Sequence, residues 1–125
     1  MPSWTLRVSA SFEAAHHLTS YHGVPEPTHG HSFRVEVALL AETLDAEGMG
    51  FDFVAVQAAL RELAAAFDHR NINDVPPFDR FSPTAEHLAV WFHDELARRF
   101  ARPAGARLTE VTVWEGPGCS ATYQP

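Results

Sequence analysis

Hydrophobic and polar residues alternate along two stretches of the chain, residues 4–13 and residues 31–40. This period of two predicts β-strands that bury one face. The apolar residues that share one side are Trp4, Leu6, Val8, Ala10 and Phe12 in the first stretch, and Phe33, Val35, Val37 and Leu39 in the second. The segment between the strands, TSYHGVPEPT, is rich in turn-forming residues.

Two later stretches carry apolar residues every three or four positions, which is typical of amphipathic helices. We expect helices over residues 53–67 and 84–100, with Asp52 capping the first and Ser82 or Thr84 capping the second. The apolar faces comprise Val56, Leu60, Leu63 and Phe67 in the first helix, and Leu88, Trp91, Phe92, Leu96 and Phe100 in the second. The segment between them, DHRNINDVPPFDRFSP, is predicted to be a long irregular loop, and loops of that length are often functional.

Two further strands are predicted near the C-terminus, over residues 107–115 and over the segment CSATY, although alternation in the first is imperfect. The order β-β-α-α-β-β predicts an α+β fold, with a four-stranded antiparallel sheet and two helices on one face. The length suits one domain over residues 1–125. The two open edges of such a sheet favour association with other copies of the chain.

Composition narrows the possible partners and compartments. The formal net charge is -7 and all nine basic residues are arginines, which argues against a nucleic-acid surface but leaves room for a phosphorylated small molecule. No apolar run approaches the roughly 18 residues that span a bilayer, and no signal peptide is apparent. The single cysteine, Cys119, excludes an intramolecular disulfide framework. We therefore expect a cytoplasmic protein without a membrane partner.

Histidines near the predicted strand ends indicate a metal site. His29 and His31 are separated by one residue, so in a strand both side chains point to the same face. The first strand ends in FEAAHHL, which brings either His16 or His17 close to that pair when the strands are antiparallel. Three neutral imidazoles with an open coordination position are typical of catalytic zinc. The alternative is that these histidines only cap the strand ends through hydrogen bonds.

Six motifs in this order and spacing resemble the 6-pyruvoyltetrahydropterin synthase and 6-carboxytetrahydropterin synthase family. They are FEAAHHL, HGHSF, GMGFDF, FDHRNIND, SPTAEHLAVWF and VWEGPGCSATY. The resemblance covers nearly the whole chain, from Phe12 to Tyr123. It implies a tunnelling fold in which three subunits join their sheets into a barrel and two trimers stack as a hexamer. It also implies active sites at subunit interfaces, a zinc ion, and 7,8-dihydroneopterin triphosphate as the substrate.

The resemblance further implies a role for particular residues of this chain. The residues are His16, His29 and His31 as zinc ligands, Asp68 and His69 as a catalytic pair, Glu115 as the anchor of the pterin ring, and Thr84 and Glu86 in the pterin pocket. His17 is then a neighbour of the site and not a ligand. Gly116 replaces the usual threonine after Glu115, which loosens the rim of the pocket without removing the carboxylate.

The expected chemistry suits these residue types. A carboxylate can accept two parallel hydrogen bonds from the N–H groups of a pterin edge. Zinc lowers the pKa of substrate hydroxyls, and a histidine beside an aspartate can carry the proton. Without the resemblance, the favoured interpretation of Glu115 is an exposed carboxylate before a Gly-Pro turn. His69 could equally interact with the dipole at a helix C-terminus.

The chain departs from the family at its catalytic cysteine. No cysteine precedes the HGH motif, and Cys119 is expected to pack as a small apolar side chain. Glu26, in EPTHGH, instead resembles the E-x-x-H-G-H signature of the type III branch, in which glutamate replaces that cysteine. That branch releases 6-hydroxymethyl-7,8-dihydropterin, a folate precursor. A solvated loop residue is the alternative for Glu26, and His22 is a second candidate base.

Three functions remain open from the sequence. The favoured one is a zinc-dependent lyase that acts on 7,8-dihydroneopterin triphosphate, with Glu26 as base. The second is a 6-carboxytetrahydropterin synthase of queuosine and 7-deazapurine biosynthesis, and the third is a pterin-binding module that has lost turnover. The triphosphate could be held by Arg34, Arg70 or Arg80, among which the sequence does not choose.

Overall fold

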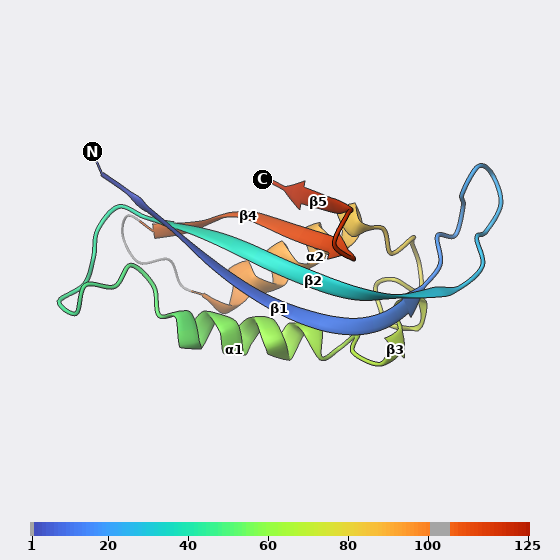
Figure 1. Ribbon diagram of the computed structural model, residues 1–125, viewed down its shortest axis with the longest axis horizontal. Helices are drawn as coiled ribbons and strands as arrows, with labels where there is room; N and C mark the ends of the chain where they lie inside the picture. The colour runs from blue at the N-terminus through green and yellow to red at the C-terminus, as the bar shows by residue number, and fades with distance from the viewer. Residues whose placement is uncertain (1, 101–105) are drawn as a thin grey trace.

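The computed structural model describes residues 2–100 and 106–125 and shows a twisted, mostly antiparallel sheet with α1 and α2 on one face (Figure 1). The long strands are β1 (Trp4–His16), β2 (His29–Ala41) and β4 (Ala106–Glu115), followed by the short β5 (Ser120–Tyr123). The helices are α1 (Phe53–Ala64) and α2 (Ala85–Arg99). The α+β layout with both helices on one face is therefore confirmed.

The sheet has a fifth strand, which corrects the expectation of four antiparallel strands. Its order is β3-β1-β2-β4-β5, and β3 (Arg70–Asn71) pairs in parallel with β1 at Ala14 and Ala15. The short 3-10 helix η1 (Ile72–Asp74) follows at once, so the expected loop is partly regular. A two-residue strand has no periodicity to detect, which is why the hydrophobic pattern does not predict it.

The alternation seen in the sequence places one face of each strand in the core. Phe12 of β1 stacks on Phe33 of β2 with ring centroids 5.1 Å apart, and Phe92 of α2 packs against Phe12 at 5.8 Å. The imperfect alternation of β4 arises from a register shift opposite Ala38 and Leu39, where a β-bulge lets Leu108 return to the core side.

Both predicted helix starts carry a side-chain cap. The side chain of Asp52 accepts a hydrogen bond from the backbone N–H of Val54, and that of Thr84 accepts one from the N–H of His87. The first helix ends at Ala64 and not at the predicted residue 67, because the chain turns there to bury Phe67. No helix within the described residues is long and apolar enough to cross a membrane.

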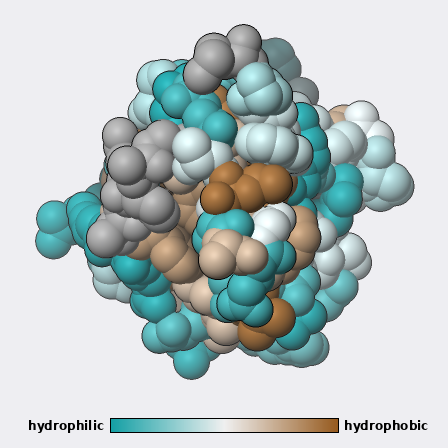
Figure 2. All heavy atoms as spheres, turned by 90° about the vertical axis from the view of Figure 1, so that its left-hand side faces the viewer, coloured by the Kyte–Doolittle hydropathy of each residue, from teal (hydrophilic) through white to brown (hydrophobic). Residues whose placement is uncertain are grey.

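The two ends of the sheet differ in character. The end where β1 finishes and β2 begins carries the histidines and the β1–β2 loop (Figure 1). The opposite end exposes several apolar side chains, among them Trp4, Leu44, Met49 and Phe53. Figure 2 shows this opposite end, where hydrophobic side chains stand among hydrophilic ones.

Candidate active site

The structure brings three histidines together where β1 ends and β2 begins. The strand register pairs His16 directly with His29, and it pairs Ala14 with His31. All three imidazoles lie on the face of the sheet that buries Phe33, and their potential ligand atoms lie within 4.8 Å of one another. His17 faces away from this group, and its Nδ1 lies 3.4 Å from the hydroxyl of Thr28.

Backbone carbonyls fix which nitrogen of two imidazoles is free. Nδ1 of His16 lies 2.9 Å from the carbonyl oxygen of Pro83, and Nδ1 of His29 lies 2.9 Å from that of Pro27. A carbonyl can only accept, so Nδ1 carries the proton and donates in both cases. Each Nε2 therefore keeps its lone pair, which is the arrangement found in metal-binding histidines.

Buried nitrogens without partners show that these residues fit a cation. Nε2 of His16 and Nε2 of His31 are both buried and have no hydrogen-bond partner within the described residues. Burial lowers the pKa of His16, although the Pro83 carbonyl and the Glu115 carboxylate oppose this effect. A neutral imidazole with an unsatisfied Nε2 is the form that binds metal. Together with His29, these two imidazoles make a set of three nitrogen ligands that suits a borderline divalent cation such as Zn²⁺.

Two carboxylates flank the three histidines. Oε1 of Glu115 lies 3.8 Å from Nε2 of His16, and Oε1 of Glu26 lies 3.7 Å from Nε2 of His29. Both side chains are mostly buried, with 26% and 18% exposure respectively. The structure therefore places Glu26 at the histidine cluster, where it can reach a ligand bound there.

The base of the β1–β2 loop holds Glu26 in this position. Oε1 of Glu26 accepts a hydrogen bond of 2.8 Å from the N–H of Leu18, and the N–H of Glu26 donates to the carbonyl of Leu18 at 3.1 Å. The loop tip is a tight turn in which His22 and Gly23 have φ angles of 53° and 88°. His22 packs there against Tyr21, with ring centroids 4.2 Å apart, so the loop directs Glu26 and not His22 toward the cluster.

Asp68 and His69 are held against β1 through the backbone of Glu13. Oδ1 of Asp68 accepts from the N–H of Glu13 at 2.9 Å, and the N–H of His69 donates to the Glu13 carbonyl at 2.6 Å. His69 has a φ of 58°, a left-handed conformation that lets the two adjacent side chains meet. Nδ1 of His69 lies 3.0 Å from Oδ2 of Asp68, so the aspartate orients the ring.

The electrostatic state of Asp68 suits this orienting role. The N–H of Glu13, and then the His69 side chain, lower the pKa of Asp68 below its usual range. The aspartate therefore stays a carboxylate over the whole neutral range. It can hold Nδ1–H of His69 and leave Nε2 of that ring to exchange a proton with a substrate.

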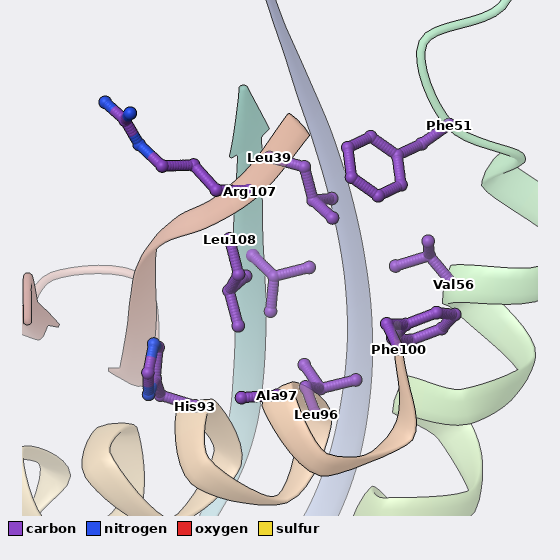
Figure 3. Close-up of a pocket in the computed structure, with 10 residues that line it drawn as sticks. Leu39, Phe51, Val56, His93, Leu96, Ala97, Phe100, Arg107 and Leu108 are labelled. Atoms are coloured by element: carbon purple, nitrogen blue, oxygen red, sulfur yellow. The ribbon is translucent and has the colours of Figure 1, made fainter. Parts of the chain in front are cut away.

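An open groove runs along the end of β1 beside His69. Its lining residues are Glu13, Ala14, Ala15, Gly30, His31, Ser32, His69, Arg70 and Asn71. Glu13 and Ser32 point to the opposite face of the sheet from His31, so His69 borders this groove and the three imidazoles lie on the other face. An apolar cavity between α2 and the sheet has a volume of only about 30 Å³ and lies at the other end of the molecule, so it has no room for a pterin (Figure 3).

The remaining predicted site residues lie on either side of the cluster. The hydroxyl of Thr84 caps α2, and the preceding residue, Pro83, holds His16 through its carbonyl. Glu86 is exposed in the first turn of α2 and has no hydrogen bond or ion pair to any described residue. Cys119 is exposed, which corrects the expectation that it packs as a small apolar side chain.

Asn73 is a site residue that sequence reasoning missed. Its side-chain oxygen accepts from the N–H of His17 at 2.9 Å, and its side-chain nitrogen donates to the carbonyl of His17 at 3.0 Å. This double hydrogen bond fastens the residue after His16 to the segment that follows His69. An Asn in a turn-rich loop is a common feature, so the sequence carries no signal for this long-range contact.

The model of the 6-pyruvoyl tetrahydropterin synthase family matches residues 5–125 of this chain. The chain belongs to this family. One relative in the family is the dihydroneopterin monophosphate aldolase of Pyrococcus furiosus, which is 30% identical over 107 residues that cover 86% of this chain and 85% of that protein. Another is the 6-carboxy-5,6,7,8-tetrahydropterin synthase of Aquifex aeolicus, which is 33% identical over 77% of this chain and 73% of that protein.

Solved structures of the family have the same fold. The 6-pyruvoyl tetrahydropterin synthase of Caenorhabditis elegans superposes with a TM-score of 0.84 and 27% identity, covering 100% of this chain and 97% of that chain. The fold of this protein is therefore the tunnelling fold, as the sequence motifs implied. Within the family, relatives carry the names of both an aldolase and a synthase, so family membership establishes pterin chemistry in general and leaves the reaction to be argued from the site.

Proposed function

We propose that this protein is a zinc-dependent lyase that cleaves the side chain of a phosphorylated 7,8-dihydroneopterin and releases 6-hydroxymethyl-7,8-dihydropterin. The observation that carries the proposal is the carboxylate of Glu26, 3.7 Å from Nε2 of His29 at the edge of the three-histidine cluster. A carboxylate in that position can remove a proton from a substrate hydroxyl. The name of the Pyrococcus furiosus relative, an aldolase acting on dihydroneopterin monophosphate, supports this kind of cleavage.

The reaction balances without an oxidant or water. Glu26 takes the proton of the hydroxyl on the second side-chain carbon, and that carbon becomes an aldehyde as its bond to the first carbon breaks. The electron pair passes to the first carbon, where it is conjugated with the pterin ring, and a proton is then added there. The products are 6-hydroxymethyl-7,8-dihydropterin and a phosphorylated glycolaldehyde. A bound zinc ion supplies Lewis-acid stabilisation of the negative charge on the substrate oxygen.

The other site residues have complementary roles. Oε1 of Glu26 accepts from Leu18, and its Oε2 has no hydrogen bond within the described residues, so Oε2 is the oxygen that takes the proton. Asp68 keeps the ring of His69 oriented, and His69 delivers the proton to the first carbon. Glu115, mostly buried beside His16, anchors the N–H donors of the pterin edge.

Product identification with a Glu26 variant tests the proposal. Zinc-loaded protein is incubated with dihydroneopterin monophosphate or triphosphate, and the released pterin is identified by mass spectrometry. Glu26→Gln should lower kcat by roughly 10²- to 10⁴-fold, because a general base is lost while the shape is kept. Glu47→Gln, in the exposed β2–α1 loop, is the matched control and should leave kcat unchanged. An unaltered rate in Glu26→Gln would remove this residue from the mechanism.

A second function is favoured by the names of other relatives. The Aquifex aeolicus and Synechocystis proteins, 33% and 36% identical to this chain, are 6-carboxy-5,6,7,8-tetrahydropterin synthases. That reaction releases acetaldehyde and 6-carboxytetrahydropterin, so the product analysis separates the two functions directly. Release of no pterin by a protein with full zinc that binds the substrate would favour the pterin-binding module.

We also propose that the active site is completed by association of several copies of the chain. The outer edge of β1 pairs with another strand only at Ala14 and Ala15 among the described residues, and β5 forms the opposite edge. Joining these edges would close the sheet into a barrel and could bring Thr84 and Glu86 of one copy to the groove of another. Native mass spectrometry should detect trimers or hexamers, and a monomer at micromolar concentration would contradict this.

A further inference from the structure

The structure discriminates between the three arginines that the sequence leaves open as phosphate ligands. Arg34 is already engaged, because its guanidinium lies 4.8 Å from the ring centroid of Trp114 and 3.9 Å from a carboxylate oxygen of Glu36. Arg80 lies in the turn before α2 and does not line the groove beside His69. Arg70 does line that groove, between His69 and Asn71.

Local structure places Arg70 in the groove and leaves its charge available. Its backbone is fixed, since it pairs with Ala14 in the sheet and its N–H donates to the carbonyl of Phe67 at 3.1 Å. Its side chain is exposed and forms no ion pair with any carboxylate of the described residues. The carboxylate in the same groove, Glu13, instead accepts a hydrogen bond of 2.7 Å from the hydroxyl of Ser32.

We propose that Arg70 binds the phosphate of the substrate side chain and thereby makes the enzyme selective for phosphorylated dihydroneopterin. A guanidinium can donate two parallel hydrogen bonds to a phosphate, and its charge is kept at any physiological pH. The chain as a whole carries a net charge of -7, so an anionic substrate needs a local cation at the point where it binds. This inference rests on the proposed function, and it adds the group that recognises the phosphate.

The position of Arg70 also agrees with the direction of the proposed reaction. Arg70 borders the groove together with His69, the proposed proton donor to the first side-chain carbon. The phosphate is one carbon beyond the bond that breaks, and Arg70 follows His69 directly in the chain. The groove is lined by one arginine, Arg70, and one carboxylate, Glu13. This charge balance matches a substrate with a single phosphate better than one with a triphosphate.

The test compares substrates that differ only in phosphorylation. The values of kcat/KM are measured for dihydroneopterin, its monophosphate and its triphosphate with the wild-type protein and with Arg70→Ala. The variant should lose about 10- to 100-fold in kcat/KM on the phosphorylated substrates, the usual effect of removing a charge-assisted hydrogen bond, mainly through KM. Its activity on dihydroneopterin itself should stay within about twofold, and Arg70→Lys should recover part of the loss.

A matched control comes from the neighbouring groove on the same edge of the sheet. Arg61 lines that groove together with Ser9, Ser11 and Asp68, and Arg61→Ala should leave the preference for phosphorylated substrate unchanged. An equal loss on all three substrates in Arg70→Ala would overturn the proposal and assign Arg70 a structural role. A larger loss on the triphosphate than on the monophosphate would overturn the match to a single phosphate.

A binding measurement separates failure of this inference from failure of the proposed function. Calorimetric titration of zinc-loaded wild-type protein and of Arg70→Ala with the monophosphate and with dihydroneopterin requires no turnover. If no substrate is cleaved but the wild type prefers the monophosphate and Arg70→Ala does not, the reaction is wrong and the assignment of Arg70 holds. If the wild type binds both compounds equally well, the assignment of Arg70 is wrong whatever the reaction.

Discussion

His31 and Leu39 lie on the same face of β2 near its two ends, and their surroundings differ completely. Leu39 borders a small apolar cavity, where side chains from both helices and the sheet point toward one another and Arg107 extends away (Figure 3). His31 lies where the same face passes beyond the helices, and its Nε2 is buried without a hydrogen-bond partner in the described part of the chain. Apolar packing satisfies Leu39 at one end of β2, whereas at the other end the buried Nε2 of His31 still lacks a hydrogen-bond partner within the described residues.

The two ends of β2 therefore have different roles, because one contributes packing to the core and the other presents the histidines of the candidate site. A buried polar atom without a partner costs about 1–3 kcal/mol, so the histidine end is less stable than it could be unless a ligand is bound there. Phe33 lies between the two environments, with its ring centroid 5.2 Å from that of His16 and 5.5 Å from that of His31. The strands therefore pass from a closed core to a cluster of histidines whose buried nitrogens are open to a ligand.

The largest expected effect comes from removing one histidine of the cluster. His31→Ala should lower kcat by about a thousandfold, because metal stabilisation of the transition state is worth several kcal/mol and each 1.36 kcal/mol is tenfold. Wild-type protein should gain thermal stability when Zn²⁺ is added, since a ligand that binds only the folded state stabilises it. The variant should lose this gain, measured by calorimetry with and without zinc. An equal gain in both proteins would show that His31 is not a ligand.

The corresponding change at the other end of β2 should affect stability and not chemistry. Leu39 is only 3% exposed, so Leu39→Ala should lower the free energy of unfolding by about 2–5 kcal/mol through lost burial and a cavity. Urea unfolding measures this loss. The zinc content and kcat of the folded variant should stay at wild-type values. A fall in kcat comparable to that of His31→Ala would mean that the two ends are coupled.

A smaller effect is expected at Asn73, which acts on the site through the backbone of His17. Asn73→Ala removes both hydrogen bonds to that residue, and loss of such a supporting contact typically weakens metal binding by about 10- to 100-fold. Competition with a chelator measures the zinc affinity. Asn73→Asp keeps the oxygen that accepts from the N–H of His17 and should recover part of the lost zinc affinity. Wild-type zinc affinity in Asn73→Ala would show that the contact serves the loop and not the cluster.

The smallest effect is the pH dependence contributed by Asp68. The N–H of Glu13 and the His69 side chain lower the pKa of Asp68, and a lowered carboxyl pKa stabilises the fold above the unfolded value of about 3.9. Asp68→Asn should therefore be less stable than wild type at neutral pH, and the difference should shrink as the pH falls below about 4. Urea midpoints at several pH values test this.

Glu110→Gln offers a comparison for that measurement. Hydrogen bonds from Gln124 and then Arg7 lower the pKa of Glu110. The stability that the Glu110 carboxylate contributes should therefore also be lost as the pH falls, as for Asp68. Glu110 is far from the histidine cluster in the register of β4, opposite Ala38. Only Asp68→Asn should also lower kcat. A stability difference for Asp68→Asn that persists at low pH would contradict the assigned interaction.

Much of this comparison could be predicted from the sequence, because it follows from local periodicity. Alternation places His31 and Leu39 on one face whatever their chemistry. It leaves both His16 and His17 open as the third histidine, and the family resemblance selects His16, which the strand register pairs with His29. The caps at Asp52 and Thr84 follow from equally local rules. The position of Glu26 required the family resemblance, since its contact with Leu18 spans a loop of irregular conformation.

Features that depend on contacts between distant segments could not be predicted. The strand β3 directly follows Asp68 and His69, which are fastened to the backbone of Glu13, and Glu13 lies 55 residues earlier than Asp68. Asn73 reaches His17 across 56 residues. Hydrophobic periodicity reports whether a residue is buried, but it carries no information about the partner of a polar side chain.

The ring of Phe33 has a consequence for how the protein matures. Because this ring closes the hydrophobic interior before the cluster begins, the 22 buried residues of that interior can assemble while the cluster is still empty. Small zinc-finger domains, in contrast, stay unfolded until their ion arrives. We therefore expect that metal can be loaded into finished protein, exchanged for a spectroscopic probe such as Co²⁺, and removed again without unfolding the chain.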